Sequence, residues 1–276
     1  MNIKIVADSS ANLFSLPGTD YASVPMKIVT DNKEFVDDGH LDSAEMMAYL
    51  DKDKGRSGSS CPNVHDWLEA FGEGENIFTL AISRSMSGSH NSALQAKEVY
   101  EEEHPDRKVC CLDTLTAGPV MILIIEKIQE LAAQGLSFQE VKAQIKEYMK
   151  KTHMIFMLSS VDNLAKNGRV NPLIAKAVGF LNIRIVGQAS DSGTFQQIHK
   201  CRGDKKGIAA LYALLKEDGY KGGKLRINHV FNEEGAKDLR ELVLEEFPQA
   251  DIAVSPTTGL CSYYAEQGGL MVGFEE

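Results

Sequence analysis

The sequence is poor in aromatic residues and has no long apolar segment. Aromatic side chains make up 7% of its 276 residues. The longest apolar run, from Ala117 to Ile125, is too short to span a bilayer and contains Pro119. The N-terminus has no basic segment followed by an apolar stretch, so we expect no signal peptide. These absences predict a protein without an integral membrane segment.

Cysteine and positive charge are also scarce. The five cysteines are odd in number and show no C-x-x-C spacing, which argues against a disulfide framework or a structural zinc site. The seven histidines form no metal-binding pattern. With 29 basic and 39 acidic side chains, the net charge is 29 − 39 = −10, unlike that of proteins that bind phosphate-rich partners. We expect no metal, no nucleic-acid partner, and a reduced, cytoplasmic location.

The hydrophobic share of 43% is sufficient for a folded core, and its pattern predicts an α/β protein. In the first half, buried strands are expected at Ile3–Ala7, Asn76–Ser83 and Lys108–Leu112, and a long helix at Val120–Leu131. Strands that alternate with helices in this way favour a mostly parallel sheet with helices on its faces.

The pattern changes near residue 153. Later strands follow one another through turns as well as helices, as at Ile183–Val186 and the strand after Gly193-Thr194. This is typical of an α+β domain with a mixed or antiparallel sheet. We therefore expect two domains, 1–153 and 154–276, with a ligand cleft between them.

Two serine-rich segments are candidates for a binding site. Ser57–Asn63 is expected to be a loop before a helix, and turn chemistry alone explains it equally well. Ser83–Asn91 joins a buried strand to a helix, where backbone N–H groups can approach a carboxylate or phosphate. It matches neither a nucleotide-binding motif nor G-x-S-x-G, and Ser87 has no visible triad partner. A hydrogen-bonding role for Ser87 is preferred.

Two other segments allow both a binding and a structural interpretation. Asp8-Ser9-Ser10 follows the first strand, and an N-cap is preferred over a ligand site. Arg169 follows Asn167-Gly168 at the end of a short predicted helix. Its guanidinium suits a carboxylate or phosphate, but Asn-Gly is also typical of a helix C-cap.

Together these segments resemble the DegV family of bacterial fatty-acid-binding proteins across nearly the whole chain. Each motif is weak alone, and their order and spacing make the resemblance specific. The matching segments are Ile5–Ser10, Val24–Met26, Asp37, Ser59–Asn63, Ser87–Ser89, Leu112–Thr114, Leu164, Asn167–Val170, Lys200–Arg202 and the glycine-rich end up to Phe274. The resemblance implies a two-domain fold that buries a long-chain fatty acid between its domains and holds no cofactor.

The resemblance also implies a carrier without catalytic residues, which presents the acyl carboxylate to a fatty-acid kinase. Ser59, Ser60, Ser87 and Gly88 are then expected to bind the carboxylate, and Arg169 to supply positive charge. Charge-assisted hydrogen bonds of this kind are what a buried carboxylate requires.

One departure from the family concerns its C-terminal His-x-Gly-Pro-Gly motif. This sequence has Tyr264-Ala265-Glu266-Gln267-Gly268 instead, so Tyr264 stands where the histidine is expected and becomes a ligand-binding candidate. The apolar segment Ile174–Leu181 is expected to form a wall of the ligand tunnel. Two alternatives remain open: a hydrolase or other enzyme acting on a small acid or ester through Ser87 or Asp8, and a lipid-sensing protein without kinase coupling.

Overall fold

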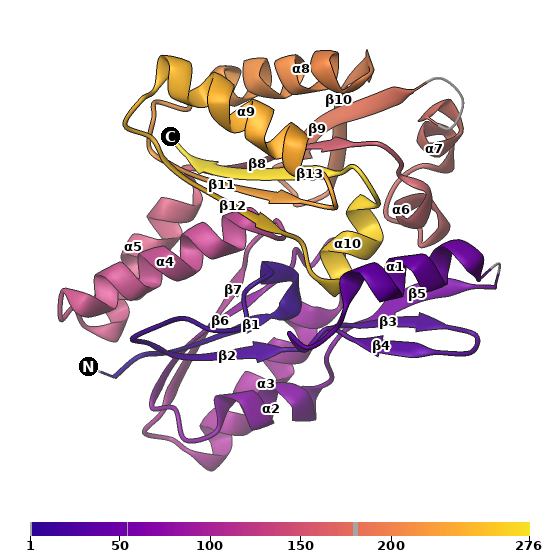
Figure 1. Cartoon of the computed structure of the whole chain (residues 1–276). Coiled ribbons are helices and arrows are strands. Elements are labelled where there is room, and N and C mark those ends of the chain that lie inside the picture. Colours follow the sequence, from indigo (N-terminus) through magenta and orange to yellow (C-terminus); the bar gives the residue numbers. More distant parts are fainter. Residues whose placement is uncertain (1, 54, 179–181) are drawn as a thin grey trace.

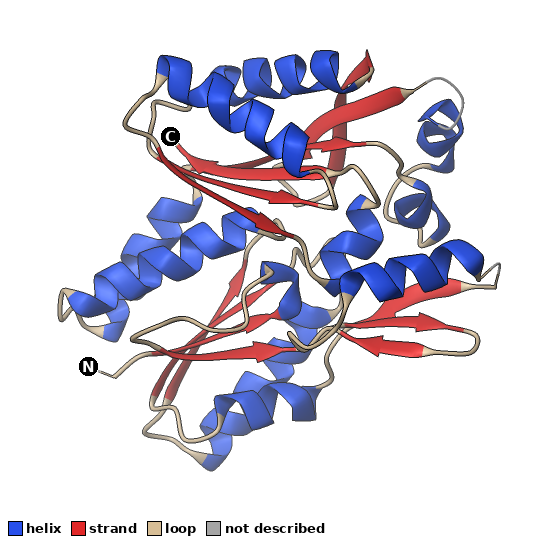
Figure 2. Ribbon diagram, viewed as in Figure 1, coloured by secondary structure: helices blue, strands red, loops and turns tan. Residues whose placement is uncertain are grey.

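The computed structural model describes residues 2–53, 55–178 and 182–276, except for the side chains of residues 176–178. Two main sheets lie one above the other, with helices between them and on their outer faces (Figure 1 and Figure 2). Residues 179–181, at the end of the expected tunnel wall, lie outside the described part of the chain. In that described part, no helix is both long and apolar enough to cross a membrane.

The first main sheet is entirely parallel, as predicted. Its strand order is β2-β1-β6-β7, made of Asp20–Val24, Lys4–Asp8, Asn76–Ala81 and Lys108–Asp113. Helices α2 (Val64–Phe71) and α3 (Ser89–Glu103) cover one face, and α4 (Pro119–Ala133) and α5 (Phe138–Met149) lie on the other (Figure 1).

A small antiparallel sheet lies beside the first, and the sequence did not predict it. Its order is β4-β3-β5, made of Glu34–Val36, Lys27–Thr30 and Ser57–Ser60. The expected loop over residues 57–60 is therefore a strand. Its Ser-Gly-Ser-Ser sequence has low strand propensity, but pairing with β3 outweighs that preference.

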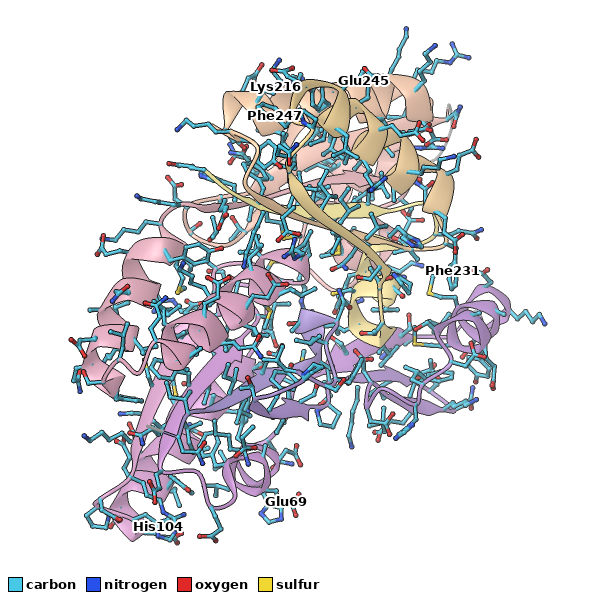
Figure 3. All side chains as sticks on the ribbon, turned by 60° about the vertical axis from the view of Figure 1, so that its left-hand side comes forward. Glu69, His104, Lys216, Phe231, Glu245 and Phe247 are labelled. Atoms are coloured by element: carbon cyan, nitrogen blue, oxygen red, sulfur yellow. The ribbon has the colours of Figure 1, made fainter. Side chains whose placement is uncertain are left out.

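The second main sheet is mixed, which confirms the predicted class. Its order is β10-β9-β8-β13-β11-β12, made of Phe195–Arg202, Ile183–Ala189, Thr152–Leu158, Leu270–Glu275, Lys224–His229 and Asp251–Pro256. Only the β11–β12 pair is parallel. Helices α8 (Asp204–Glu217) and α9 (Glu233–Glu246) cover its outer face, where Lys216 and Glu245 project outward (Figure 3).

Helix α4 packs between the two main sheets. Its apolar side chains join the core of the first sheet, and the helix also contacts β8, β11 and β13 of the second. A helix that is apolar on nearly all sides is stable only when buried in this way. Three short elements lie near the same junction: η1 (Ser9–Ala11), α6 (Asp162–Lys166) and α10 (Gly259–Ala265); α7 (Pro172–Val178) follows α6.

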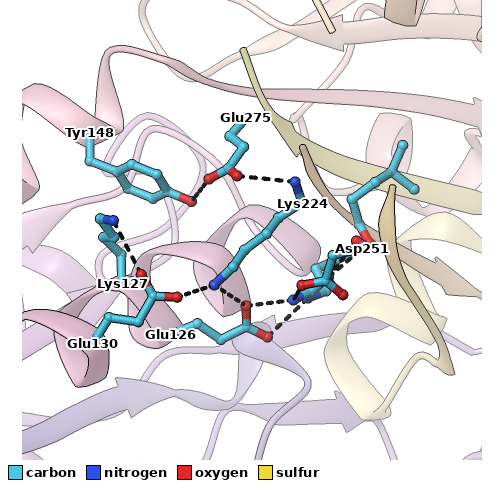
Figure 4. A network of polar contacts seen from close by, with 9 residues as sticks. Glu126, Lys127, Glu130, Tyr148, Lys224, Asp251 and Glu275 are labelled. Atoms are coloured by element: carbon cyan, nitrogen blue, oxygen red, sulfur yellow. Dashed lines mark hydrogen bonds and ion pairs between the residues drawn. The ribbon is translucent and has the colours of Figure 1, made fainter. Parts of the chain in front are cut away.

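A polar network also joins α4 to the second sheet (Figure 4). The guanidinium of Arg226 on β11 bonds to both carboxylate oxygens of Glu126, at 2.9 and 2.8 Å, and to Asp251 on β12 at 3.0 Å. Lys224 contacts Glu126 at 3.4 Å and also pairs with Glu130. These contacts hold the helix against the strands.

Side-chain caps fix the starts of two helices. Helix α1 (Ser43–Lys52) is capped by Asp42, whose carboxylate accepts from Ala44 N and Glu45 N. Helix α2 begins after Asn63, which forms a capping box with Asp66.

Candidate functional site

A cavity lies at the junction of the sheets and is lined almost entirely by apolar side chains. Together with its open mouth, it contains about 830 Å³ of space free of atoms. Its apolar wall contains Met26, Ile82, Met86, Leu115, Ala117, Met154, Phe156, Leu158, Leu164, Ala189, Phe195, Leu260, Cys261, Tyr264, Ala265 and Met271. Strands β8, β9, β10 and β13, helices α6 and α10, and the loops after β6 and β7 all contribute.

The polar part of the wall consists of a few hydroxyl groups and one charge. The hydroxyls are those of Ser59, Ser83, Ser87, Thr116 and Thr194, together with the phenol of Tyr264. Arg169 is the only charged side chain among the described residues that line the cavity. An apolar chamber with one cation suits a ligand that is mostly hydrocarbon and ends in an anion.

Two tyrosines of α10 fix one side of this polar part. The hydroxyl of Tyr264 lies 2.7 Å from Ser59 Oγ, and that of Tyr263 lies 2.9 Å from Ser57 Oγ. Ser57 and Ser59 face the same side of β5 because side chains alternate along a strand. The same alternation turns Ser60 away: it is exposed and does not line the cavity.

Arg169 occupies its position through a helix C-cap, as the structural interpretation of its sequence predicts, and its side chain also lines the cavity. Gly168 has a φ of +72°, and the backbone N–H groups of Gly168 and Arg169 donate to Ala165 O and Leu164 O at 3.1 and 2.8 Å. These two hydrogen bonds form the Schellman motif, which favours glycine at the position with positive φ. The guanidinium of Arg169 donates through Nε to Met86 O at 3.2 Å, and its central carbon lies 5.9 Å from the ring centre of Tyr264.

The loop before α3 supplies Ser87. Its hydroxyl lines the cavity and accepts a 3.3 Å hydrogen bond from Ser89 N. Within the described chain, Ser87 has no hydrogen bond to a histidine that would activate it as a nucleophile. Gly88 is exposed beside Cys61 and does not line the cavity. Of the six residues predicted for the site, the structure therefore brings Ser59, Ser87, Arg169 and Tyr264 to the cavity.

Asp8, the other enzymatic candidate, is fully buried and does not line the cavity. Its carboxylate caps η1, as the sequence predicts, and all its hydrogen bonds are to protein groups in its surroundings. Burial raises its pKa, and hydrogen bonds from Ser10, Ser89 and Ile82 oppose that rise. The residue is thus held in a structural role.

The thiol of Cys261 lines the cavity but is not suited to nucleophilic chemistry. Burial is the main cause that raises its pKa, and its Sγ lies 3.4 Å from Ser10 O. A buried thiol with a raised pKa is a poor nucleophile. Across the described residues, no group of three or more His, Cys, Asp or Glu is placed to hold a metal ion.

Sequence reasoning missed the methionines of the wall. Met26, Met86, Met154 and Met271 reach the cavity from four segments distant in sequence. Met26, Met86 and Met271 fall in segments that were singled out for other residues, and no periodicity connects the four. Methionine is flexible and polarizable, so such a wall adapts to apolar ligands of different shape.

The fold and the cavity define an α/β protein with an apolar chamber that opens to the surface. The family model described as "Uncharacterised protein, DegV family" matches residues 2–276. The chain belongs to the DegV family.

Individual relatives agree over the full length. A DegV domain-containing protein of Streptococcus pneumoniae serotype 4 is 46% identical, with 100% of this chain and 99% of the relative covered. A crystal structure of a DegV family protein from Eubacterium eligens, loaded with heptadecanoic acid, has a TM-score of 0.97 at 45% identity, covering 99% of both chains. The fatty acid kinase (Fak) B3 protein of S. pneumoniae, loaded with linoleic acid, has a TM-score of 0.98 at 46% identity, covering 100% of this chain and 99% of the other.

Proposed function

We propose that this protein binds a long-chain fatty acid and carries it, without acting on it as an enzyme. The observation that supports this most directly is the apolar cavity with Arg169 as its one charged lining side chain. Two relatives of nearly half identical sequence hold heptadecanoic and linoleic acid. These ligands combine a long hydrocarbon chain with one carboxylate, as the cavity's lining requires.

The physical basis of binding divides between the two ends of the ligand. Each buried CH₂ contributes about 0.8 kcal/mol, so the alkyl chain supplies most of the affinity. The carboxylate is costly to bury and needs charge-assisted hydrogen bonds. In this proposal Ser59, Ser87, Arg169 and Tyr264 supply them. Ser60 and Gly88, which the sequence predicts as carboxylate ligands, are not part of the proposed site because neither residue lines the cavity.

Arg169 has donors to spare for this purpose. Its Nε and Nη1 donate to the backbone oxygens of Met86 and Asn167. Among the described residues, no acceptor bonds to Nη2, and that group is the one we assign to the carboxylate.

We also propose that the carrier presents its ligand to a fatty-acid kinase in the cytoplasm. The structural similarity to the S. pneumoniae fatty acid kinase (Fak) B3 protein supports such a partner. The division into domains 1–153 and 154–276, with the cavity between them, belongs to the same proposal. The hydrolase alternative finds less support, since Ser87 lacks an activating histidine in the described structure and Asp8 lies away from the cavity.

Lipid extraction from the purified protein tests the binding proposal. We expect mass spectrometry to find a bound long-chain acid, and delipidated protein to take up heptadecanoic or linoleic acid in equimolar amount. Ala117→Trp fills the cavity wall and should abolish uptake, whereas Ala143→Trp, on the exposed side of α5, should not. Absence of a co-purified acid together with no uptake of either added acid contradicts the proposal.

A further inference from the structure

Two buried carboxylates outside the cavity, those of Asp8 and Asp37, are each 0% exposed. Neither takes part in an ion pair with any residue that the structure describes. Burial of a carboxylate is costly unless several donors satisfy it, so two such groups require a physical reason.

Asp37 holds the start of α10. Its Oδ1 accepts a hydrogen bond from Gly259 N at 2.9 Å, and its Oδ2 accepts one from Leu260 N at 3.0 Å. The hydroxyl of Thr258 approaches Oδ2 at 3.4 Å, but this residue, which stands at the N-cap, makes no side-chain cap of its own. The unpaired N–H groups of the first turn are therefore satisfied by a residue 222 positions away. One turn further along α10 stands Tyr264.

Asp8 holds the loop that carries Ser87. Its Oδ2 accepts a hydrogen bond from Ile82 N at 3.0 Å, at the start of the loop, and from Ser89 Oγ at 2.6 Å, at its end. Its Oδ1 accepts from the backbone and hydroxyl of Ser10. The loop is thus fixed at both ends, and the segment between them lines the cavity with Ile82, Ser83, Met86 and Ser87.

Ser9 connects the two carboxylates. Its hydroxyl donates to Asp37 Oδ2 at 2.9 Å and accepts from Met26 N at 3.0 Å, and Met26 is itself part of the cavity wall. The turn after β1 therefore reaches three wall segments: the loop before α3, the start of α10 and the residue that follows Pro25.

We infer that Asp8 and Asp37 are positioning residues, which set the separation of Ser87 and Tyr264 on the two sides of the ligand's head group. This inference rests on the proposed function, because it assigns the acyl carboxylate to that gap. An ionised carboxylate accepts at two oxygens, whereas an amide accepts at one and turns its NH₂ toward the remaining donors. Aspartate is thus the residue that can hold several donors at each position.

Asp37→Asn is the central variant, and it should shift α10. We expect its affinity for palmitic acid to fall at least tenfold, while its affinity for methyl palmitate, which lacks the charged head group, falls less than threefold. Asp8→Asn should also lose more affinity for palmitic acid than for methyl palmitate, because it displaces Ser87. Asp42→Asn is the matched control, because Asp42 also caps a helix but α1 carries no residue of the cavity wall. Its affinities for both ligands should stay unchanged.

A double-mutant cycle separates positioning from a general loss of stability. If Asp37 acts through Tyr264, adding Asp37→Asn to the Tyr264→Phe variant should lower the affinities for palmitic acid and methyl palmitate by the same factor. Equal loss for acid and ester in Asp37→Asn, or full additivity in the cycle, overturns the inference.

Two results keep the test decisive. If Asp37→Asn does not fold, Ser9→Ala removes one donor to Asp37 and should still weaken acid binding about threefold more than ester binding; equal weakening overturns the inference. Failure of the unmodified protein to bind either ligand is a different result, which contradicts the proposed function itself.

Discussion

The hydroxyl of Tyr264 and Oγ of Ser59 lie 2.7 Å apart, although 205 positions separate them in the sequence. The contact joins α10, which packs under the second sheet, to β5 of the small sheet. Arg169 lies over the same tyrosine ring, with 5.9 Å between the guanidinium carbon and the ring centre. One aromatic side chain therefore brings a hydroxyl and a cation together at the cavity.

Removal of the Ser87 hydroxyl should weaken fatty-acid binding without unfolding the protein. Ser87→Ala loses a hydrogen bond to a charged group, which corresponds to roughly 1.5–3 kcal/mol. Isothermal titration calorimetry with palmitic acid measures the loss. Ser92→Ala, on the helix that follows Ser87 but away from the cavity, is the control. Unchanged affinity of Ser87→Ala at intact thermal stability removes Ser87 from the site.

Arg169 should matter for the charge of the ligand and little for its chain. We expect Arg169→Ala to reduce binding of palmitic acid at least tenfold and binding of hexadecanol much less, because only the acid needs the guanidinium. Arg169→Lys keeps the positive charge but loses the planar guanidinium with its paired N–H donors. Its affinity for palmitic acid should therefore lie between those of Arg169→Ala and the unmodified protein. Equal losses for acid and alcohol show that Arg169 is structural and that the carboxylate is held elsewhere.

The sequence predicted those parts of the site that depend on local structure. The strand-to-helix junction that contains Ser87 follows from an apolar run and the serine-rich segment after it, and Asn167-Gly168 marks the helix end that positions Arg169. Both features are encoded within about ten residues, and the structure confirms both.

The remaining parts depend on distant contacts that no local pattern reveals. Ser57–Ser60 has the composition of a loop, and it becomes a strand because it pairs with β3 and contacts the tyrosines of α10. The role of Asp37 is hidden for the same reason, since it caps a helix near the other end of the chain. Tertiary context outweighs local propensity at both places.

The ion pair between Asp251 and Arg226 predicts a pH-dependent contribution to stability. Hydrogen bonding to Arg226 holds the pKa of Asp251 below its ordinary value of 3.8. A carboxyl whose pKa is lower in the folded state stabilises the protein above its unfolded pKa, and that stability is lost as the pH falls through the folded pKa.

Asp251→Asn should therefore lower the melting temperature at pH 7, and the difference from the unmodified protein should shrink below roughly pH 3. Differential scanning fluorimetry across pH 2.5–8 makes the comparison, with Glu245→Gln on the outer face of α9 as the control (Figure 3). A difference that persists undiminished at low pH shows that the effect of the substitution does not come from the charge of Asp251.

Tyr264 stands where the family resemblance leads one to expect a histidine. Variants at this position can therefore distinguish fatty-acid binding from coupling to a kinase. Chain burial and the hydroxyls supply affinity without an imidazole, so the protein should bind fatty acid well. An imidazole titrates near neutrality and can both accept and release a proton at a reacting head group, whereas a phenol keeps its proton in that pH range. We therefore expect slow acyl-phosphate formation with a fatty-acid kinase, and a faster rate for Tyr264→His at similar affinity for the acid.

The assay follows acyl-phosphate formation by the organism's own kinase, with Tyr264→Phe as the control that keeps the ring beneath Arg169 but removes the hydroxyl bonded to Ser59. Rapid acyl-phosphate formation by the unmodified protein, unimproved by histidine, shows that this carrier needs no imidazole at the head group.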